Sequence, residues 1–148
     1  MQKPTRVVFG ADHAGFSLKE SLKQYLQNRH IDVIDIGTMS EESVDYPAIM
    51  RKAAAAVLEY GCPGIIIGGS GNGEAIAANK VRGIRAAVCY STEIARLARA
   101  HNDANIMSLG ARFTDEALAK QMVDVFLSTD FEGGRHIARI ADLDTPLA

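Results

Sequence analysis

The sequence is poor in cysteine and lacks tryptophan, and neither sign of charge dominates it. Its two cysteines, Cys62 and Cys89, are too few for a disulfide framework and too far apart for a paired metal site, so we expect a reducing, cytoplasmic location. The formal net charge of −2 over 148 residues gives no field that would recruit nucleic acid or an anionic membrane. No apolar run approaches the roughly 20 residues that cross a bilayer, and the polar residues 1–6 contain no signal-peptide core. Any anion site must therefore be built locally.

What the sequence does contain is a regular alternation of strand-like and helix-like segments. Short apolar runs predict strands at 7–9, 31–36, 64–68, 86–89 and 106–109. The segments between them predict helices at 16–26, 47–60, 74–80, 92–101 and 114–127, and a short basic helix at 133–141 ends the chain. Strands that are apolar on both sides belong in a parallel sheet with helices on both faces. The sequence thus predicts one α/β domain over residues 1–148, with a five-stranded parallel sheet and a short C-terminal helix.

Polar and titratable residues gather in the segments between these elements. Ligands of parallel α/β folds bind beyond the carboxyl ends of the strands, so the segments after strands are the first candidates for a site. They are Gly10–Gly15 after the first strand, Gly68–Glu74 after the third and Gly110–Arg112 after the fifth, joined by His101–Asn105 after the fourth helix. We expect all four to contribute to one ligand crevice.

The glycine-rich segment Gly69–Gly73 is the sharpest of these features. Glycines let successive backbone N–H groups point at one anion, and the following helix adds the positive end of its dipole. The spacing excludes a nucleotide site, since the G-x-G-x-x-G frame ends on Glu74 or Ile76, and Phe16 stands where a P-loop needs lysine. A carboxylate at the loop exit would repel a phosphate but suits a transient anion such as an enediolate. The alternative interpretation is a tight turn in which Glu74 only favours the helix N-terminus.

Aldose–ketose isomerisation by proton transfer needs a base, donors for the enediolate oxygens, a proton shuttle and a group that opens the sugar ring. Glu74 can serve as the base and Ser70 as the shuttle. His101 or Asp12 can open the ring, and the choice between them stays open. The oxyanion donors would be backbone N–H groups of the loop, at Gly69, Gly71, Asn72 and Gly73.

A phosphate-binding site completes the groups that this reaction needs. Arg135 and Arg139 lie four residues apart, on one face of the predicted last helix, and can hold a phosphate bidentately. Arg112 and His13 can join them. The alternative is that the arginines form a solvated face or surface ion pairs and that His13 is structural. The phosphate site therefore depends on the last helix returning to the crevice.

Taken together, these segments resemble a known family of enzymes. The motifs that carry the resemblance run in order through nearly the whole chain: Gly10-Ala-Asp-His-Ala-Gly-Phe, Asp45-Tyr-Pro, Gly68–Lys80, His101-Asn-Asp-Ala-Asn, and Glu132-Gly-Gly-Arg-His with Arg139. In this combination they are similar to the RpiB/LacA/LacB family of sugar-phosphate isomerases. The resemblance implies a Rossmann-like three-layer fold and a homodimer with active sites across the subunit interface, in which dimers sometimes pair into tetramers. It also implies interconversion of ribose 5-phosphate and ribulose 5-phosphate without a metal or cofactor.

The resemblance further implies a place for each site residue. Around the sugar it places Asp12, Tyr46, His101 and Asn102, around the phosphate His13, Arg112, Arg135 and Arg139, and at the reacting oxygens Ser70 and the loop amides. One position departs from a large branch of the family, which uses a cysteine base at the end of the third strand. This chain has Gly68 there, so it is similar to the branch whose base is the glutamate after the loop, here Glu74.

Three alternatives remain open from the sequence. The same chemistry on allose 6-phosphate, galactose 6-phosphate or a tetrose phosphate would require only a different substrate length. A non-catalytic phosphosugar-binding protein is disfavoured because binding alone needs no base such as Glu74. A metal-dependent hydride-shift isomerase is disfavoured because the four histidines, His13, His30, His101 and His136, show no close ligand spacing.

Overall fold

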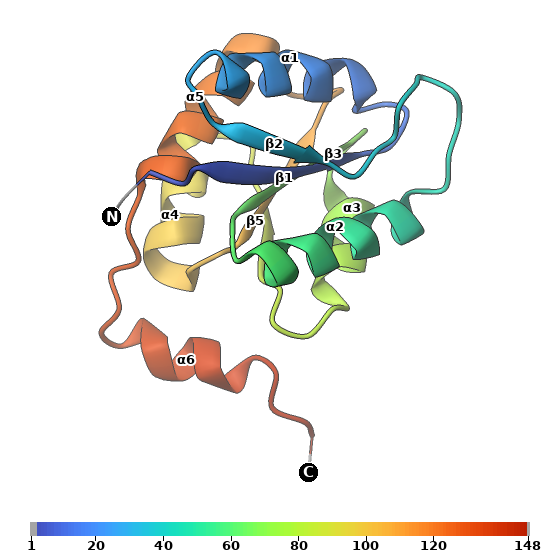
Figure 1. Ribbon diagram of the computed structural model, residues 1–148. Helices are drawn as coiled ribbons and strands as arrows, with labels where there is room; N and C mark the ends of the chain where they lie inside the picture. The colour runs from blue at the N-terminus through green and yellow to red at the C-terminus, as the bar shows by residue number, and fades with distance from the viewer. Residues whose placement is uncertain (1–2, 148) are drawn as a thin grey trace.

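The computed structural model describes residues 3–147, in which strands and helices alternate until two helices end the chain (Figure 1). The strands are β1 (Arg6–Ala11), β2 (Asp32–Asp35), β3 (Gly64–Gly68), β4 (Ala86–Val88) and β5 (Ile106–Gly110). The helices are α1 (Phe16–Gln27), α2 (Tyr46–Tyr60), α3 (Asn72–Asn79), α4 (Thr92–Asn102), α5 (Glu116–Ser128) and α6 (His136–Asp142). Every predicted element is present, within a few residues of its expected bounds.

The strands form one five-stranded sheet in the order β2-β1-β3-β5-β4, and every pairing is parallel. The central strand β3 is buried along its whole length, as expected for the run of isoleucines that it contains. Its register with β5 aligns Gly68 with Gly110, so both strands end at the same level. The predicted parallel α/β architecture is confirmed.

Two apolar cores, one on each face of the sheet, make the fold a three-layer sandwich. Side chains of α1, α4 and α5 fill one core, and those of α2 and α3 fill the other. Figure 1 shows α1 and α5 on one side of the strands and α2 and α3 on the opposite side. Successive residues of β3 serve opposite cores, since Ile65 and Ile67 belong to the first and Ile66 to the second. This alternation explains why the strand is apolar at every position.

Local signals set most of the helix boundaries. Pro47 lies in the first turn of α2, and Gly61 ends that helix in the left-handed conformation, with φ of 60°. The Ser91 hydroxyl caps α4 by accepting the Ile94 N–H at 3.2 Å. One boundary differs from the prediction: α5 is capped by Asp115, whose carboxylate accepts the Leu118 N–H at 2.8 Å, and not opened by Thr114.

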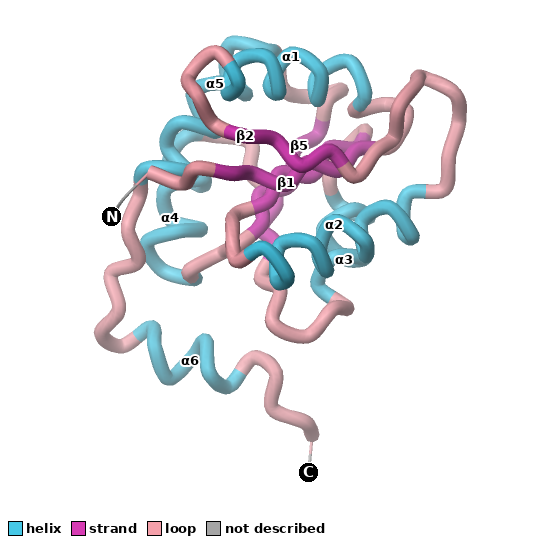
Figure 2. The backbone as a smooth tube through the Cα atoms, viewed as in Figure 1, coloured by secondary structure: helices cyan, strands magenta, loops and turns pink. Residues whose placement is uncertain are grey.

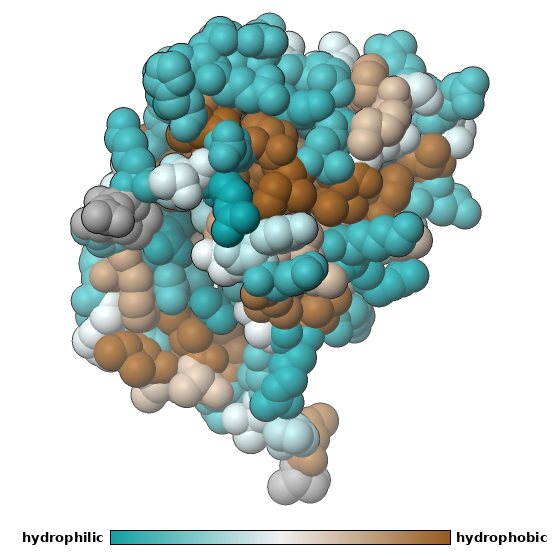
Figure 3. Space-filling view, in the orientation of Figure 1, coloured by the Kyte–Doolittle hydropathy of each residue, from teal (hydrophilic) through white to brown (hydrophobic). Residues whose placement is uncertain are grey.

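The last helix, α6, stands apart from the sandwich. Figure 2 shows it beyond a long loop, and it packs beside α4 with none of its described residues buried. Ile137 and Leu143 on this segment are 58% and 63% exposed, and Figure 3 shows hydrophobic side chains gathered around it. Within residues 3–147, no helix combines the length and apolar character needed to cross a membrane.

Candidate active site

The structure divides the predicted site residues between the two edges of the sheet. Asp12, Glu74 and Arg112 lie at the carboxyl edge, because each follows a strand. His101 and Asn102 end helix α4, which runs back from that edge, so they lie at the amino edge. There the Asn105 carbonyl accepts the N–H of Gly64, the first residue of β3, at 2.9 Å, and the Asn102 carbonyl accepts from Arg85 Nε at 3.0 Å.

This division means that the four segments cannot share one crevice within a single chain. The five residues of β3 separate the edges by about 16 Å, at roughly 3.3 Å per residue. The arginines of the predicted phosphate site lie at the amino edge too, because α6 lies beside α4 and does not return to the carboxyl edge of its own chain. Arg139 instead lines a cavity of about 260 Å³ with His101, Asn102 and His136.

At the carboxyl edge, the Glu74 carboxyl group lies directly over the backbone of Gly68. Glu74 belongs to the first turn of α3 and is only 4% exposed. A Cβ added to Gly68 would overlap the Glu74 carboxyl group. Glycine at the end of β3 is therefore what gives this side chain its space. The glutamate and a side chain at residue 68 cannot occupy this place together.

A second buried carboxyl group, that of Asp12, lies beside Glu74. Asp12 is 7% exposed, and its Oδ1 accepts the Gly15 N–H at 3.0 Å. Burial raises the pKa of Glu74, the Asp12 carboxylate raises it further, and the backbone N–H groups of Glu74 and Gly71 oppose the shift. A carboxylate whose pKa is raised toward the working pH is a stronger base, so this pair is equipped for proton transfer.

The glycine-rich loop is fixed by contacts that the sequence did not reveal. Gly71 has φ of 85°, a left-handed conformation, and its carbonyl accepts the buried Ser108 hydroxyl at 2.7 Å. The Tyr90 hydroxyl donates to the Ser70 carbonyl. Ser108 could have been noticed as the single polar residue in a buried strand, whereas nothing in the sequence marked Tyr90. The Ser70 hydroxyl accepts the Asn72 N–H at 3.2 Å, so its own proton is free to donate.

Three further predicted residues surround the mouth of this loop. The Tyr46 hydroxyl lies against Gly73. The Arg112 guanidinium lies against Gly69. The backbone N–H of Arg112 donates to the Gly69 carbonyl at 3.1 Å. His13 accepts the Val44 N–H on Nδ1 at 3.3 Å, which leaves Nε2 as the donor of a neutral ring. Donors and acid/base groups thus converge around the loop amides.

The amino edge holds a separate group around His101. Its ring stacks on that of His136, with centroids 4.5 Å apart and planes inclined by 15°, and Glu132 Oε1 lies 3.7 Å from His101 Nε2. Within residues 3–147 these three side chains are the group that could bind a metal, with one donor atom each inside 4.8 Å. This group was not predicted from the sequence, because His101 lies about 30 residues before Glu132 and His136.

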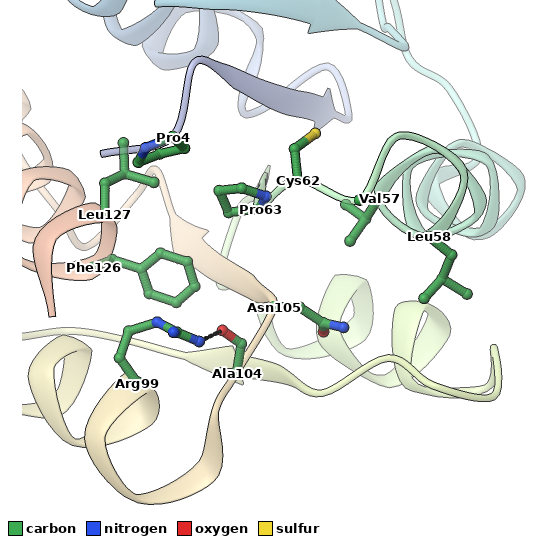
Figure 4. A pocket seen from close by; sticks show the side chains of 11 residues that line it. Pro4, Val57, Leu58, Cys62, Pro63, Arg99, Ala104, Asn105, Phe126 and Leu127 are labelled. Atoms are coloured by element: carbon green, nitrogen blue, oxygen red, sulfur yellow. Dashed lines mark hydrogen bonds between the residues drawn. The ribbon is translucent and has the colours of Figure 1, made fainter. Parts of the chain in front are cut away.

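The cavity drawn in Figure 4, of about 300 Å³, also lies at the amino edge but offers no acid/base pair. Its walls are mainly apolar, and the Arg99 guanidinium that borders it donates to Ala104 and Asp103. Burial raises the pKa of the Cys62 thiol in its wall, and raises that of Cys89 to about 12. Both cysteines are therefore protonated near neutral pH and poor nucleophiles.

Comparison with known proteins shows the family to which the chain belongs. A family model described as Ribose/Galactose Isomerase matches residues 7–143. The chain belongs to this family. It is 45% identical to the ribose-5-phosphate isomerase B of Escherichia coli over 136 residues, covering 91% of each chain.

Solved structures of the family superpose closely on this chain. The crystal structure of a ribose 5-phosphate isomerase from Thermotoga maritima has a TM-score of 0.92 and 49% identity, with 95% of this chain and 97% of that chain covered. That of ribose-5-phosphate isomerase B from Mycoplasma genitalium, with bound ribulose-5-phosphate, has a TM-score of 0.88 and 36% identity, with 93% and 92% covered.

Proposed function

We propose that this chain is an aldose–ketose isomerase that interconverts ribose 5-phosphate and ribulose 5-phosphate, with Glu74 as its base. The observation that carries the proposal is a buried carboxylate of raised pKa at the exit of a glycine-rich anion loop. The name of the Escherichia coli relative and the ligand of the Mycoplasma genitalium structure support this choice of substrate.

The reaction is a proton transfer between two neighbouring carbons of the open-chain sugar. Glu74 removes the proton from C2 of the aldose, and the electrons of the C–H bond form the enediolate. The Gly73 N–H, in the first turn of α3, and that of Gly69 stabilise the oxyanion, whereas the Asn72 N–H is held by the Ser70 hydroxyl. Ser70 passes a proton between the two oxygens, and Glu74 returns its proton to C1.

Ring opening and phosphate binding are proposed to involve both edges of the sheet. Asp12 is close to Glu74 in the same chain, whereas His101, Asn102, Arg135 and Arg139 lie at the opposite edge. A homodimer in which the amino edge of one copy covers the carboxyl edge of the other would complete the site. The exposed apolar side chains of Ile137 in α6 and of Leu143 directly after it support such an interface. Arg112 and His13 would meet the phosphate from the first copy.

The experiment that tests the proposal is a rate panel with the purified protein in deuterated water. Ribose 5-phosphate should be converted to ribulose 5-phosphate, and NMR should show solvent deuterium at the transferred position. Allose 6-phosphate, galactose 6-phosphate and tetrose phosphates should react more slowly. If one of these sugars reacts faster than ribose 5-phosphate, that sugar is the proposed substrate instead. If neither ribose 5-phosphate nor any of these sugars reacts, the proposal is overturned.

A further inference from the structure

Lys19 is a charged side chain in the interior, beneath the carboxyl edge of the sheet. It belongs to α1 and has an exposure of 0%. Its ammonium donates to the two carboxylate oxygens of Asp35 at 2.7 and 2.8 Å and to the Thr38 carbonyl at 2.6 Å. All three N–H bonds are satisfied, as a buried ammonium requires. An apolar side chain of similar volume often fills such a place without loss of stability, so the role of the charge needs another explanation.

The partners of Lys19 lie where the chain leaves the sheet to form loop 37–45. Figure 1 shows this loop, between β2 and α2, standing clear of the helices. Asp35 also accepts the Gly37 N–H at 2.9 Å, which links the carboxylate to the start of the loop. The Ala11 N–H donates to the Gly37 carbonyl, and the Thr38 N–H donates to the Ala11 carbonyl, both at 2.6 Å. Lys19 therefore fixes the loop beside the last residue of β1.

Both ends of loop 37–45 adjoin residues placed around the substrate. At its beginning, the pairing with Ala11 sets the backbone that leads directly into Asp12 and His13. Near its end, the Val44 N–H donates to His13 Nδ1, and two residues later Tyr46 begins α2. The middle of the loop is largely exposed, with Met39 at 66%. The anchors at its ends are therefore what determine its position.

We propose that Lys19 is a positioning residue for substrate binding. Through Asp35 and Thr38 it holds loop 37–45 against His13 and Tyr46, so that these two side chains meet the phosphosugar in a fixed arrangement. Lys19 itself does not touch the substrate. The inference rests on the proposed function, because that function gives His13 and Tyr46 their roles. Glu74 lies on α3 and reaches this chain of contacts only through Asp12, whose Oδ1 is held separately by the Gly15 N–H, so Lys19 affects affinity more than the chemical step.

The test compares Lys19→Met with Lys23→Met as a matched control. Lys23 donates to the same Asp35 carboxylate, at 2.6 Å, but its partners among the described residues are only carboxylates and not the loop carbonyl. Lys19→Met should raise KM for ribose 5-phosphate about tenfold and change kcat less than about threefold, because loop 37–45 loses its charged hydrogen bond and binding must then order His13 and Tyr46. Lys23→Met should leave both constants within about twofold of wild type.

Hydrogen exchange supplies a readout that does not depend on substrate. In Lys19→Met, the hydrogen-bonded amides at the ends of the loop, those of Gly37, Thr38 and Val44, should exchange about tenfold faster, while those of β3 and α3 keep their wild-type rates. Lys23→Met should match wild type throughout. This measurement still decides whether Lys19 holds the loop if the wild-type protein does not isomerise ribose 5-phosphate, so the two proposals fail separately.

Two results would overturn the positioning role. In the first, folded Lys19→Met has the KM and loop exchange of Lys23→Met. In the second, kcat falls as much as affinity and exchange rises equally in β1, β3 and the loop, which is the result of general destabilisation. If Lys19→Met does not fold, Asp35→Asn takes its place, since it weakens the anchor of the ammonium and keeps the Thr38 contact. It should give a smaller rise in KM with loop-specific exchange, and the absence of both overturns the proposal.

Discussion

The two edges of the sheet differ in how far this chain alone prepares them for chemistry. At the carboxyl edge, Glu74 and Asp12 are 4% and 7% exposed and are held by backbone contacts. At the amino edge, the His101 and Glu132 side chains are 37% and 52% exposed, and α6 buries none of its described residues. A base needs a desolvated, fixed environment, whereas groups that grip a substrate can remain open until it arrives. Under the proposed function, the carboxyl edge supplies the desolvated half of the site and the amino edge supplies the open half.

The largest expected effect is the loss of kcat when the proposed base at the carboxyl edge, Glu74, is replaced. Glu74→Gln keeps the shape of the side chain but cannot accept a proton, so kcat should fall about 10²–10⁴-fold. Exchange of the substrate C2 proton with solvent should fall by the same factor. Glu116→Gln is the matched control, because Glu116 also lies in the first turn of a helix but is exposed. Near-normal turnover by Glu74→Gln would show that another group is the base.

A second variant tests whether the position of Glu74 matters as much as its charge. The added methyl group of Gly68→Ala overlaps the carboxyl group and must displace it. A displacement of about 1 Å can lower a rate about 10²-fold, so we expect kcat to fall by that order. The Gly68→Ala, Glu74→Gln double variant should be no slower than Glu74→Gln. Additive losses would mean that Gly68 acts independently of Glu74.

Substitutions of the arginines at the amino edge should slow the reaction of the phosphorylated sugar and not that of the free sugar. Arg139→Ala and Arg135→Ala each remove a charge-assisted contact of about 1.5–3 kcal/mol, which lowers kcat/KM roughly ten- to a hundredfold on ribose 5-phosphate. Free ribose lacks the phosphate and should react poorly with wild type and variants alike. Arg51→Ala, which changes an exposed arginine of α2, is the control. Equal losses on both sugars would identify Arg139 as structural.

The smallest expected effect concerns stability rather than rate. The folded protein holds the pKa of Glu74 above its usual value, so ionisation of Glu74 destabilises the fold as pH rises through that pKa. Glu74→Gln should therefore raise Tm at pH 7.5 above that of wild type, by the few degrees typical of a single substitution in a domain of this size. At pH 4 the difference should nearly vanish. A variant that is less stable than wild type at pH 7.5 would contradict the burial of an ionised Glu74.

Much of the fold and half of the site follow from local patterns in the sequence. The alternation of strands and helices, the buried run of β3 and the glycine loop with Glu74 could all be predicted, because short-range periodicity determines them. The place of His101 at the amino edge could also have been predicted, because a helix that follows a parallel strand ends at the opposite edge of the sheet. The burial of Lys19 could not be predicted, since it depends on Asp35, a partner on another element. The exposed position of α6 could not be predicted either, because the pattern of a short helix does not show which element it packs against.

The central claim is that the two half-sites come together between copies of the chain, and mixing two inactive variants tests it most directly. Glu74→Gln lacks the base at the carboxyl edge, and Arg139→Ala lacks the phosphate ligand at the amino edge. A mixed dimer of the two would contain one intact site and one doubly defective site. Random reassociation of equal amounts should therefore restore about a quarter of wild-type activity on ribose 5-phosphate, because half of the dimers are mixed. Activity that stays at the average of the two separate variants after verified subunit exchange would show that each site is built within a single chain.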